Sequence, residues 1–261
     1  MHEIIKNIYN TRIISDDQNI EHRVHSYIDK HEYKFLSDFI QSKPDILSTL
    51  EVGCGFGIST FCICSMLSDR EHAHHTIIDP FQNTPYKDPC TGEIVIDFHG
   101  LGISNLKRAG YNFFELIEKT SDLALPELLK DKKGQFDMIF IDGWHSFDQV
   151  ILDLYYANKL IRIGGYIIVD DCDFCSVGKA VNCLSQYPAY KVESHITRKY
   201  NNISTKRKCG NLLKMILPST LSKFILPKYF YDRYYIQLNP TMIAFKKIDD
   251  DNREWHWSGS F

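Results

Sequence analysis

The sequence predicts an α/β fold built around a mainly parallel, doubly wound sheet. Short apolar runs such as Leu47–Val52 and Phe136–Asp142 alternate along the chain with stretches in which apolar residues follow helical spacing. In the clearest of these stretches, apolar residues recur at i, i+3, i+4 and i+7 between Phe147 and Ile161. Strands that alternate with helices of this length form right-handed βαβ units, and such units build parallel sheets.

The individual elements follow from local patterns. Residues 31–43 have helical spacing that ends at Pro44, and the apolar residues 58–67 predict a helix directly after a glycine-rich loop. Gly164 and Gly165 are expected to end the helix that begins at Phe147. We expect further helices around 104–109 and at 177–184, and strands at 47–52, 76–79, 113–117, 136–142, 166–169, 190–195 and 241–246.

Three segments lie outside this alternation. Residues 1–30 are polar, have no strong period and predict a surface arm in front of a main domain of residues 31–261. Residues 82–102 contain several glycines and prolines and predict a loop insertion. Residues 196–240 form a second insertion between the last two expected strands. From Arg198 to Arg233 this insertion has nine basic residues and one acid, a net charge of +8, in a chain whose net charge is −3.

The basic insertion also contains apolar and aromatic residues, which leaves three interpretations open. It could cover the acceptor site or form a homodimer contact. It could bind a membrane surface peripherally through residues 198–233. It could contact nucleic acid through Lys and Arg with interleaved aromatic residues. A charged segment with apolar residues is usually a packed element with one solvated face, so the order of preference is cover or dimer contact, membrane surface, nucleic acid.

Composition excludes several classes of protein. With 261 residues, 44 % of them hydrophobic and 13 % aromatic, the chain can bury a sizeable core and is not a disordered protein. It has no run of about 18 apolar residues, as a spanning helix would need, and no apolar signal-peptide core at its start. We therefore expect a cytoplasmic protein whose eight cysteines are reduced. Cys172 and Cys175 form a single C-x-x-C, which without a second pair does not predict zinc.

A glycine loop lies between the expected strand 47–52 and the helix 58–67. Gly53, Gly55 and Gly57 have the spacing G-x-G-x-G, which lets a backbone turn tightly and approach a ligand at a helix N-terminus. A dinucleotide fingerprint would have its third glycine one residue later. Glu51 would repel a pyrophosphate but would suit a cation such as the sulfonium of S-adenosylmethionine. Asp79, at the end of the next strand, can accept two hydrogen bonds from a ribose diol. The pattern therefore predicts an adenosyl-ligand site.

Three carboxylates follow adjacent expected strands. Asp142 comes directly after one strand, and Asp170 and Asp171 come directly after the next. In open α/β sheets ligands bind outside the carboxyl ends of the strands. Carboxylates that meet there either bind a hard cation such as Mg²⁺ or share a proton.

Four segments of the chain together resemble the class I S-adenosylmethionine-dependent methyltransferases. They are LEVGCGFGIST at 50–60, IIDPF at 77–81, FDMIFIDGWH at 136–145 and GGYIIVDD at 164–171. The branch that they resemble most contains small-molecule O-methyltransferases of the catechol and macrocin type. The resemblance covers residues 31–195 and the strand near 241–246, and it does not extend to residues 1–30 or to the basic insertion.

This resemblance implies a fold and a set of site residues. The fold would be a Rossmann-like sheet of about seven strands with an antiparallel last strand. Asp142, Asp170 and Asp171 would hold a divalent metal that binds and acidifies the acceptor hydroxyl. Ser121 and Asp122, after the third strand, would lie where this fold contacts adenine. Glu51, the three glycines and Asp79 would complete the cofactor site.

His145 departs from the metal-dependent members of that branch. Its imidazole could act as a general base, could orient another residue, or could simply begin a helix. A hydroxyl acceptor must lose its proton near neutral pH, and Asp142 and His145 are the expected catalytic residues. The sequence thus predicts methyl transfer to a small-molecule acceptor. The alternatives are a nucleotide-binding oxidoreductase, which the glycine spacing and Glu51 oppose, and an adenosyl-ligand-binding protein without activity.

Overall fold

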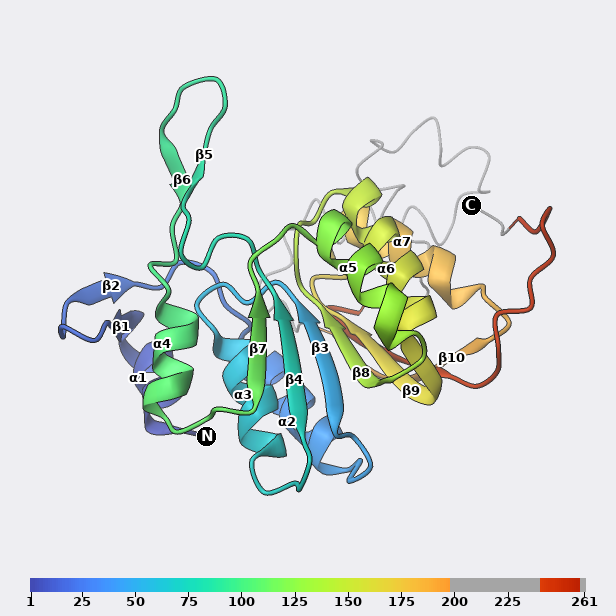
Figure 1. The fold of residues 1–261 in the computed structure, drawn as a ribbon, viewed down its shortest axis with the longest axis horizontal. Helices are drawn as coiled ribbons and strands as arrows, with labels where there is room; N and C mark the ends of the chain where they lie inside the picture. Colours follow the sequence, from blue (N-terminus) through green and yellow to red (C-terminus); the bar gives the residue numbers. More distant parts are fainter. Residues whose placement is uncertain (198–239, 259–261) are drawn as a thin grey trace, which may run out of the picture.

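A seven-stranded sheet forms the centre of the molecule in a computed structural model that describes residues 1–197 and 240–258 (Figure 1). The strand order is β10-β11-β9-β8-β3-β4-β7. β3, β4, β7, β8 and β9 run parallel, and β11 runs antiparallel to both of its neighbours. The bounds are β3 Ser48–Val52, β4 His74–Ile78, β7 Phe114–Ile117, β8 Phe136–Ile141, β9 Ile161–Val169, β10 Tyr190–Ile196 and β11 Met242–Lys247. The Rossmann-like, doubly wound sheet with its antiparallel last strand is confirmed.

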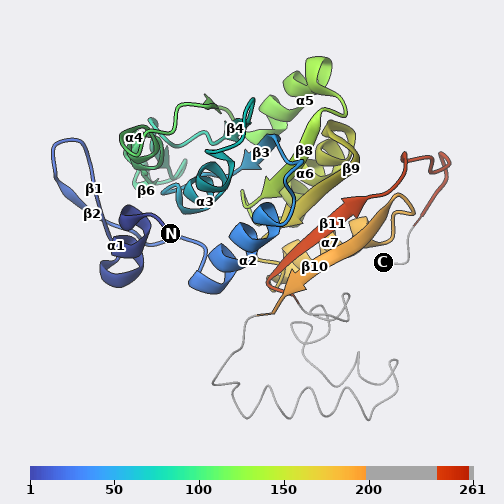
Figure 2. The same ribbon diagram turned by 90° about the horizontal axis from the view of Figure 1, so that it is seen from below.

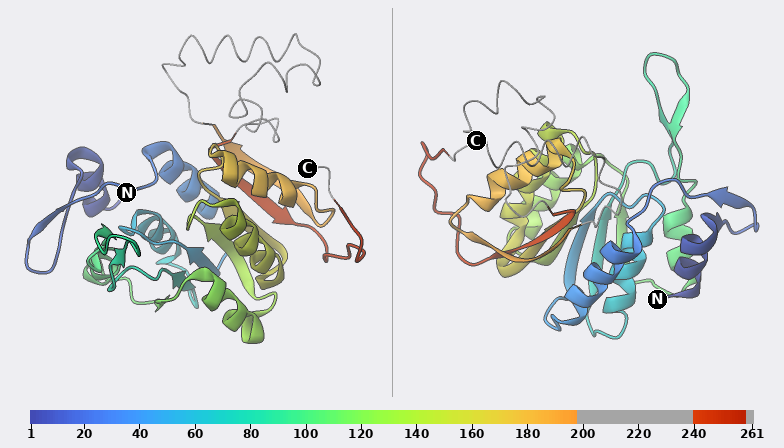
Figure 3. Two further views of the ribbon diagram at one scale, coloured as in Figure 1. Left: turned by 90° about the horizontal axis from the view of Figure 1, so that it is seen from above. Right: turned by 180° about the vertical axis from the view of Figure 1, so that it is seen from behind.

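Helices cover both faces of this sheet. α1 to α4 pack with one apolar core and α5 to α7 with a second core on the opposite face. Figure 3 shows the two layers on either side of the strands, and Figure 2 shows β10 and β11 together at one edge of the sheet. The bounds are α1 Glu3–Thr11, α2 Lys30–Gln41, α3 Ile58–Leu67, α4 Leu101–Arg108, α5 Ser121–Lys132, α6 Phe147–Leu160 and α7 Cys175–Ser185.

Successive side chains of the central strands belong to opposite cores. In β8, Met138 and Phe140 join the core under α2 and α3, whereas Ile139 and Ile141 join the core under α5 and α6. This follows from the two-residue period of a strand. A parallel strand covered on both faces must be apolar at every position, which explains why Phe136–Asp142 is so clear a strand in the sequence.

The N-terminal 30 residues form regular structure that the sequence did not indicate. α1 is followed by a hairpin of β1, Ile13–Ser15, and β2, Glu21–Arg23. Ile5 and Ile8 are fully buried, and they belong to the same core as α2 and α3. Ile4 and Tyr9 are partly buried beside them, so the helix has an amphipathic spacing that the sequence analysis did not use. The expected surface arm is therefore packed against the body along its apolar face.

Three other expectations differ from the structure. The loop expected at 82–102 contains a hairpin, β5 Tyr86–Lys87 and β6 Ile94–Ile96, which projects from the body in Figure 1. Helix α5 was not expected, because Pro126 in its interior disguises the pattern. Gly164 and its neighbour do not end α6, which stops at Leu160, but lie within β9. A left-handed Gly164, with φ of +83°, allows the strand to bend there.

The basic insertion lies almost entirely outside the described residues, which stop at 197 and resume at 240. Its expected roles as a cover, a homodimer contact or a peripheral membrane contact stay predictions. Of the helices in the described ranges, none has both the length and the apolar character that crossing a membrane requires.

A polar cluster joins α5 and α6 beneath the surface. Gln149 Nε2 donates to Ser121 Oγ at 2.7 Å and, more weakly, to Asp153 Oδ1 at 3.4 Å. Oδ2 of Asp153 is buried and has no hydrogen-bond partner among the described residues. Asp153 is only 1 % exposed, and burial raises the pKa of its carboxyl to about 6, although Ser121 and Gln149 nearby act to lower it.

The raised pKa of Asp153 predicts a pH-dependent cost in stability. The unfolded carboxyl ionises near pH 4 and the folded one near pH 6. Between these values the unfolded state loses its proton first, so the free energy of unfolding falls as pH rises. Asp153→Asn removes this titration. Relative to the unmodified protein, the variant should gain about 2 kcal/mol between pH 4 and pH 7, as measured by urea unfolding. Exposed Asp148, changed to Asn, is the control and should show no such gain. A pH-independent difference for Asp153→Asn would contradict the prediction.

Candidate active site

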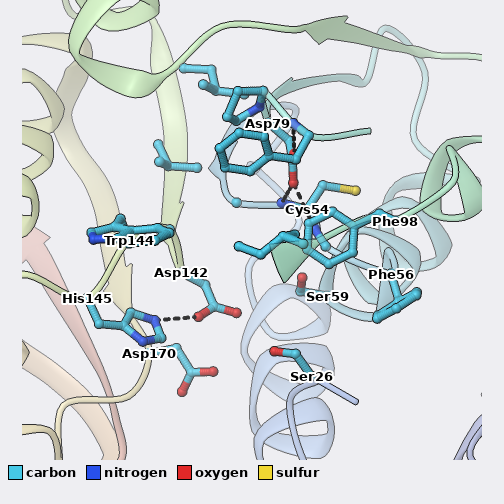
Figure 4. A pocket seen from close by; sticks show the side chains of 18 of the residues that line it. Ser26, Cys54, Phe56, Ser59, Asp79, Phe98, Asp142, Trp144, His145 and Asp170 are labelled. Atoms are coloured by element: carbon cyan, nitrogen blue, oxygen red, sulfur yellow. Dashed lines mark hydrogen bonds and ion pairs between the residues drawn. The ribbon is translucent and has the colours of Figure 1, made fainter. Parts of the chain in front are cut away.

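A cavity of about 530 Å³ opens at the carboxyl ends of β3, β4, β8 and β9. Most of the residues expected from the sequence line it. They are Gly53, Gly55, Asp79, Ser121, Asp122, Asp142, His145, Asp170 and Asp171. Figure 4 shows Asp79 beside the glycine loop at one end and Asp142 with His145 at the other. Glu51 and Gly57 do not line the cavity.

The glycines allow the loop to pack against backbone. Gly53 has a φ of +90°, and a Cβ there would lie 2.1 Å from the carbonyl oxygen of Asp142. Gly57 has a φ of +82°, and a Cβ there would lie 2.7 Å from Cα of Gly102 in α4. Both positions exclude any larger residue on conformational and steric grounds. Gly57 therefore fixes the loop in place without contacting the cavity.

Asp79 holds the glycine loop through its carboxylate. Oδ2 accepts from the backbone N–H groups of Cys54 and Gly55, both at 2.9 Å, and Oδ1 accepts from that of Phe81 at 2.8 Å. A carboxylate offers about four acceptor positions, so one position on Oδ1 stays open. The residue expected to bind a ribose diol with two hydrogen bonds thus also orders the loop, and in this geometry it has one acceptor position to spare.

Glu51 lies beneath the loop rather than in the cavity. Its side chain is fully buried, and Oε2 lies 3.1 Å from Nε2 of His75. The other ring nitrogen of His75 lies 2.8 Å from Oγ1 of Thr49. This buried chain joins neighbouring strands β3 and β4 on the face that α2 and α3 cover. The other oxygen, Oε1, has no hydrogen-bond partner among the described residues, and the expected contact of Glu51 with the cofactor stays a prediction.

Two aspartates and a histidine converge at the other end. His145 Nε2 lies 3.4 Å from Oδ1 of Asp142 and 3.6 Å from Oδ2 of Asp171. One potential ligand atom of each residue lies within 4.8 Å of the others. The metal site expected from the sequence contained Asp142, Asp170 and Asp171. In the structure the group contains His145 instead of Asp170. Asp171, which has a left-handed φ of 51°, and Asp170 both line the cavity, but only Asp171 joins this group.

Asp170 lies deeper in the wall of the cavity. It is 4 % exposed, and its Oδ1 has no hydrogen-bond partner among the described residues. Burial, and then the negative charges of Asp142, Glu32 and Asp171, raise the pKa of its carboxyl well above the usual range. Asp170 is therefore a carboxyl group that tends to keep its proton.

The same effects set the proton affinities of Asp142 and His145. Burial, assisted by the charge of Asp171, raises the pKa of Asp142, although the hydrogen bond to His145 opposes this. For His145, burial acts to lower the pKa, but the hydrogen bond to Asp142 and the charges of both aspartates raise it. Asp142 and His145 therefore share a proton as a coupled pair.

Several cavity residues were not found from the sequence. Aromatic rings form one wall, with Tyr86 of the hairpin 5.3 Å from Phe81 and 6.0 Å from the half-exposed Trp144, between ring centroids. Residues 25–28 and the buried Glu32 close the opposite side. The position of Trp144 between Asp142 and His145 was a usable signal. Residues 25–28 and Glu32 have no motif and reach the cavity only through the tertiary fold.

Comparisons with known proteins agree with this geometry. Residues 50–172 match a family model described as a methyltransferase domain. An uncharacterized protein of Acanthamoeba polyphaga mimivirus is 27 % identical over 130 residues, which are 49 % of this chain and 53 % of that protein. The match thus spans about half the length of the curated relative.

Solved structures of methyltransferases share the fold. An O-methyltransferase from Bacillus cereus in complex with SAH has a TM-score of 0.52 and 18 % identity, over 66 % of this chain and 76 % of that one. The O-methyltransferase of tomaymycin synthesis from Streptomyces achromogenes, in complex with SAM, has a TM-score of 0.52 and 19 % identity. The match covers 66 % of this chain and 75 % of that one. An SAH-bound methyltransferase from Podospora anserina has a TM-score of 0.53 and 15 % identity. The match covers 74 % of this chain and 82 % of that one. Residues 50–172 of this chain thus match the model of a methyltransferase domain, and the chain shares the fold of these methyltransferase structures.

Proposed function

We propose that the protein transfers a methyl group from S-adenosylmethionine to a hydroxyl group of a small-molecule acceptor. The observation that carries this proposal is the content of one cavity. The glycine loop and Asp79 lie at one end, and the proton-binding group of Asp142, His145 and Asp171 lies at the other. The solved structures of similar fold that hold SAM or SAH support the choice of cofactor, and two of them are O-methyltransferases.

The residues near the glycine loop suit the nucleoside part of the cofactor. The open acceptor position on Oδ1 of Asp79 can receive a ribose hydroxyl. Ser59, in the first turn of α3, projects into the cavity (Figure 4), where it adds a hydroxyl at a helix N-terminus. The aromatic wall of Phe81, Tyr86 and Trp144 offers apolar surface for a planar base.

Methyl transfer in this cavity needs alignment and removal of one proton. The cofactor supplies a methyl group on a sulfonium, and the acceptor oxygen forms the new bond to carbon as the carbon–sulfur bond breaks and its electron pair stays on sulfur. The chain fixes the geometry, because the Gly53 backbone packs against that of Asp142. The acceptor proton passes to the Asp142–His145 pair, which lies in the same cavity with His145 Nε2 3.4 Å from Asp142 Oδ1.

The same group fits a divalent cation as a second element of the site. Asp142 and Asp171 offer carboxylate oxygens and His145 an imidazole nitrogen, within 4.8 Å of one another. A cation held there would lower the pKa of an acceptor hydroxyl that binds to it. Mg²⁺ prefers oxygen ligands, so the imidazole nitrogen favours a transition ion such as Mn²⁺ over the Mg²⁺ expected from the sequence.

The compartment follows from the cysteines. The seven cysteines in the described ranges are all free, and five of them are buried. Free thiols in this number fit a reducing compartment. We therefore propose that the reaction takes place in the cytoplasm.

Asp79→Ala should weaken cofactor binding. The substitution removes the ribose acceptor and leaves three loop N–H groups without their partner. Hydrogen bonds to a charged group are worth about 1.5–3 kcal/mol, so we expect Kd for S-adenosylhomocysteine to rise about 10- to 100-fold. Isothermal titration calorimetry measures this, with the exposed Asp69→Ala as a matched control. Equal affinities for the two variants would contradict the assignment, provided that circular dichroism shows both to be folded.

Asp142→Asn and His145→Gln should each lower kcat about 10²- to 10⁴-fold, because each removes one of the two groups that together accept the proton. The KM for S-adenosylmethionine should change little. Release of S-adenosylhomocysteine, measured with a panel of catechols and sugars as acceptors, gives both constants. Asp148→Asn, which changes an exposed carboxylate in the first turn of α6, is the control. Full activity of both site variants with an acceptor that the unmodified protein methylates would exclude this role.

A metal site would be visible without an acceptor. We expect Mn²⁺ to bind in calorimetry, and Asp171→Asn to weaken that binding at least about tenfold by removing one of two carboxylate ligands. The exposed Asp148→Asn should bind as the unmodified protein does. If Mn²⁺ does not bind, and a chelator leaves methyl transfer unchanged, the cation has no part in the reaction and proton removal rests on Asp142 and His145.

A further inference from the structure

Gln149 lines the cavity from the first turn of α6, near the start of α5. Its amide nitrogen already has two protein partners, the Ser121 hydroxyl and the Asp153 carboxylate. An ionised carboxylate only accepts hydrogen bonds, so the nitrogen of the amide must face Asp153. The orientation of the amide is thereby determined.

The amide oxygen of Gln149 is the part left for a ligand. Among the described residues, Oε1 forms no hydrogen bond. By contrast, the Ser121 hydroxyl already accepts a hydrogen bond from Gln149. Ser121 lines the cavity as expected from the sequence, but its hydroxyl serves the protein. The acceptor that this cluster can present to the cavity is therefore the oxygen of Gln149.

Gln149 lines the same cavity as Asp79, which is the expected ribose ligand. The aromatic residues Phe81 and Trp144 and the residues that begin α5 line it too. A purine stacked along the aromatic wall directs its polar edge toward α5 and α6. At carbon 6 of the purine, on that edge, adenine has an amino group that donates hydrogen bonds. A 6-oxopurine has there an oxygen that accepts them.

We propose that Gln149 determines the specificity for adenine by accepting a hydrogen bond from its 6-amino group, and that Ser121 and Asp153 are positioning residues that fix the amide. This inference rests on the proposed function. A 6-oxopurine would place two acceptors against each other. A site built to hydrogen-bond one partner rejects the analogue that cannot donate, and one such bond corresponds to about 10- to 100-fold in affinity.

The test compares S-adenosylhomocysteine with S-inosylhomocysteine, which has a 6-oxopurine in place of adenine. Calorimetry gives Kd for both ligands. The unmodified protein should prefer the adenine ligand about 10- to 100-fold, and Gln149→Ala should reduce the ratio to about threefold or less by weakening that ligand alone. Gln135→Ala, an exposed glutamine after α5, is the matched control and should keep the ratio.

A second variant tests the positioning role. Asp153→Asn keeps the size of the side chain but can donate as well as accept, so the Gln149 amide is free to turn over. The preference for adenine should fall although no cavity residue has changed, and affinity for the 6-oxo ligand should rise. A merely structural role for Asp153 would weaken both ligands equally.

The outcomes separate this inference from the proposed function. If the unmodified protein binds neither ligand, the proposed function is wrong and the inference with it. If it prefers adenine and Gln149→Ala retains that preference while Asp122→Ala loses it, only the inference is overturned, and Asp122 recognises the base.

Discussion

The close approach of two backbones, at Gly53 after β3 and at Asp142 after β8, sets the geometry of the site. The distance of 2.1 Å from a hypothetical Cβ of Gly53 to the Asp142 carbonyl oxygen leaves no space for a side chain. The parallel pairing of β3 with β8 brings the two strand ends to the same level. The glycine loop begins at the end of β3, and the acid–histidine group, which is Asp142, His145 and Asp171, begins at the end of β8. The distance between the two halves of the cavity is therefore fixed by backbone rather than by flexible side chains.

Hydrogen bonds from β4 complete this arrangement. Asp79 binds two loop N–H groups and a third of its own turn, so the loop, the end of β4 and the cavity wall move as one unit. The buried chain of Thr49, His75 and Glu51 joins the same two strands beneath the loop. Glu51 therefore contributes to the packing of the two strands that position the loop.

The sequence predicted those features that depend on local pattern. The strands of the sheet, the glycine loop and the strand-end acids all have periods or spacings that need no tertiary information. Asp170 and Asp171 show where this ends, because they follow β9, and the sequence does not indicate that Asp171 rather than Asp170 groups with Asp142 and His145. Gln149 and Asp153 resemble ordinary polar residues of an amphipathic helix, and only the packing of α6 on α5 reveals their contact with Ser121. Helix α5 itself was hidden by Pro126.

The electrostatics of the cavity bear on the proposed reaction. Among its described lining residues are six carboxylic acids and no lysine or arginine; the acids are Glu32, Asp79, Asp122, Asp142, Asp170 and Asp171. The negative charge of these acids favours the binding of a cation. If they attracted only the sulfonium, that attraction would weaken in the transition state, because the positive charge on sulfur disappears there. The acid–histidine group offsets that loss. As sulfur becomes neutral, the acceptor oxygen gives its proton to the Asp142–His145 pair, so the positive charge moves across the cavity instead of leaving it. The same carboxylates then stabilise the start and the end of the transfer, which a cavity lined with lysine or arginine could not do.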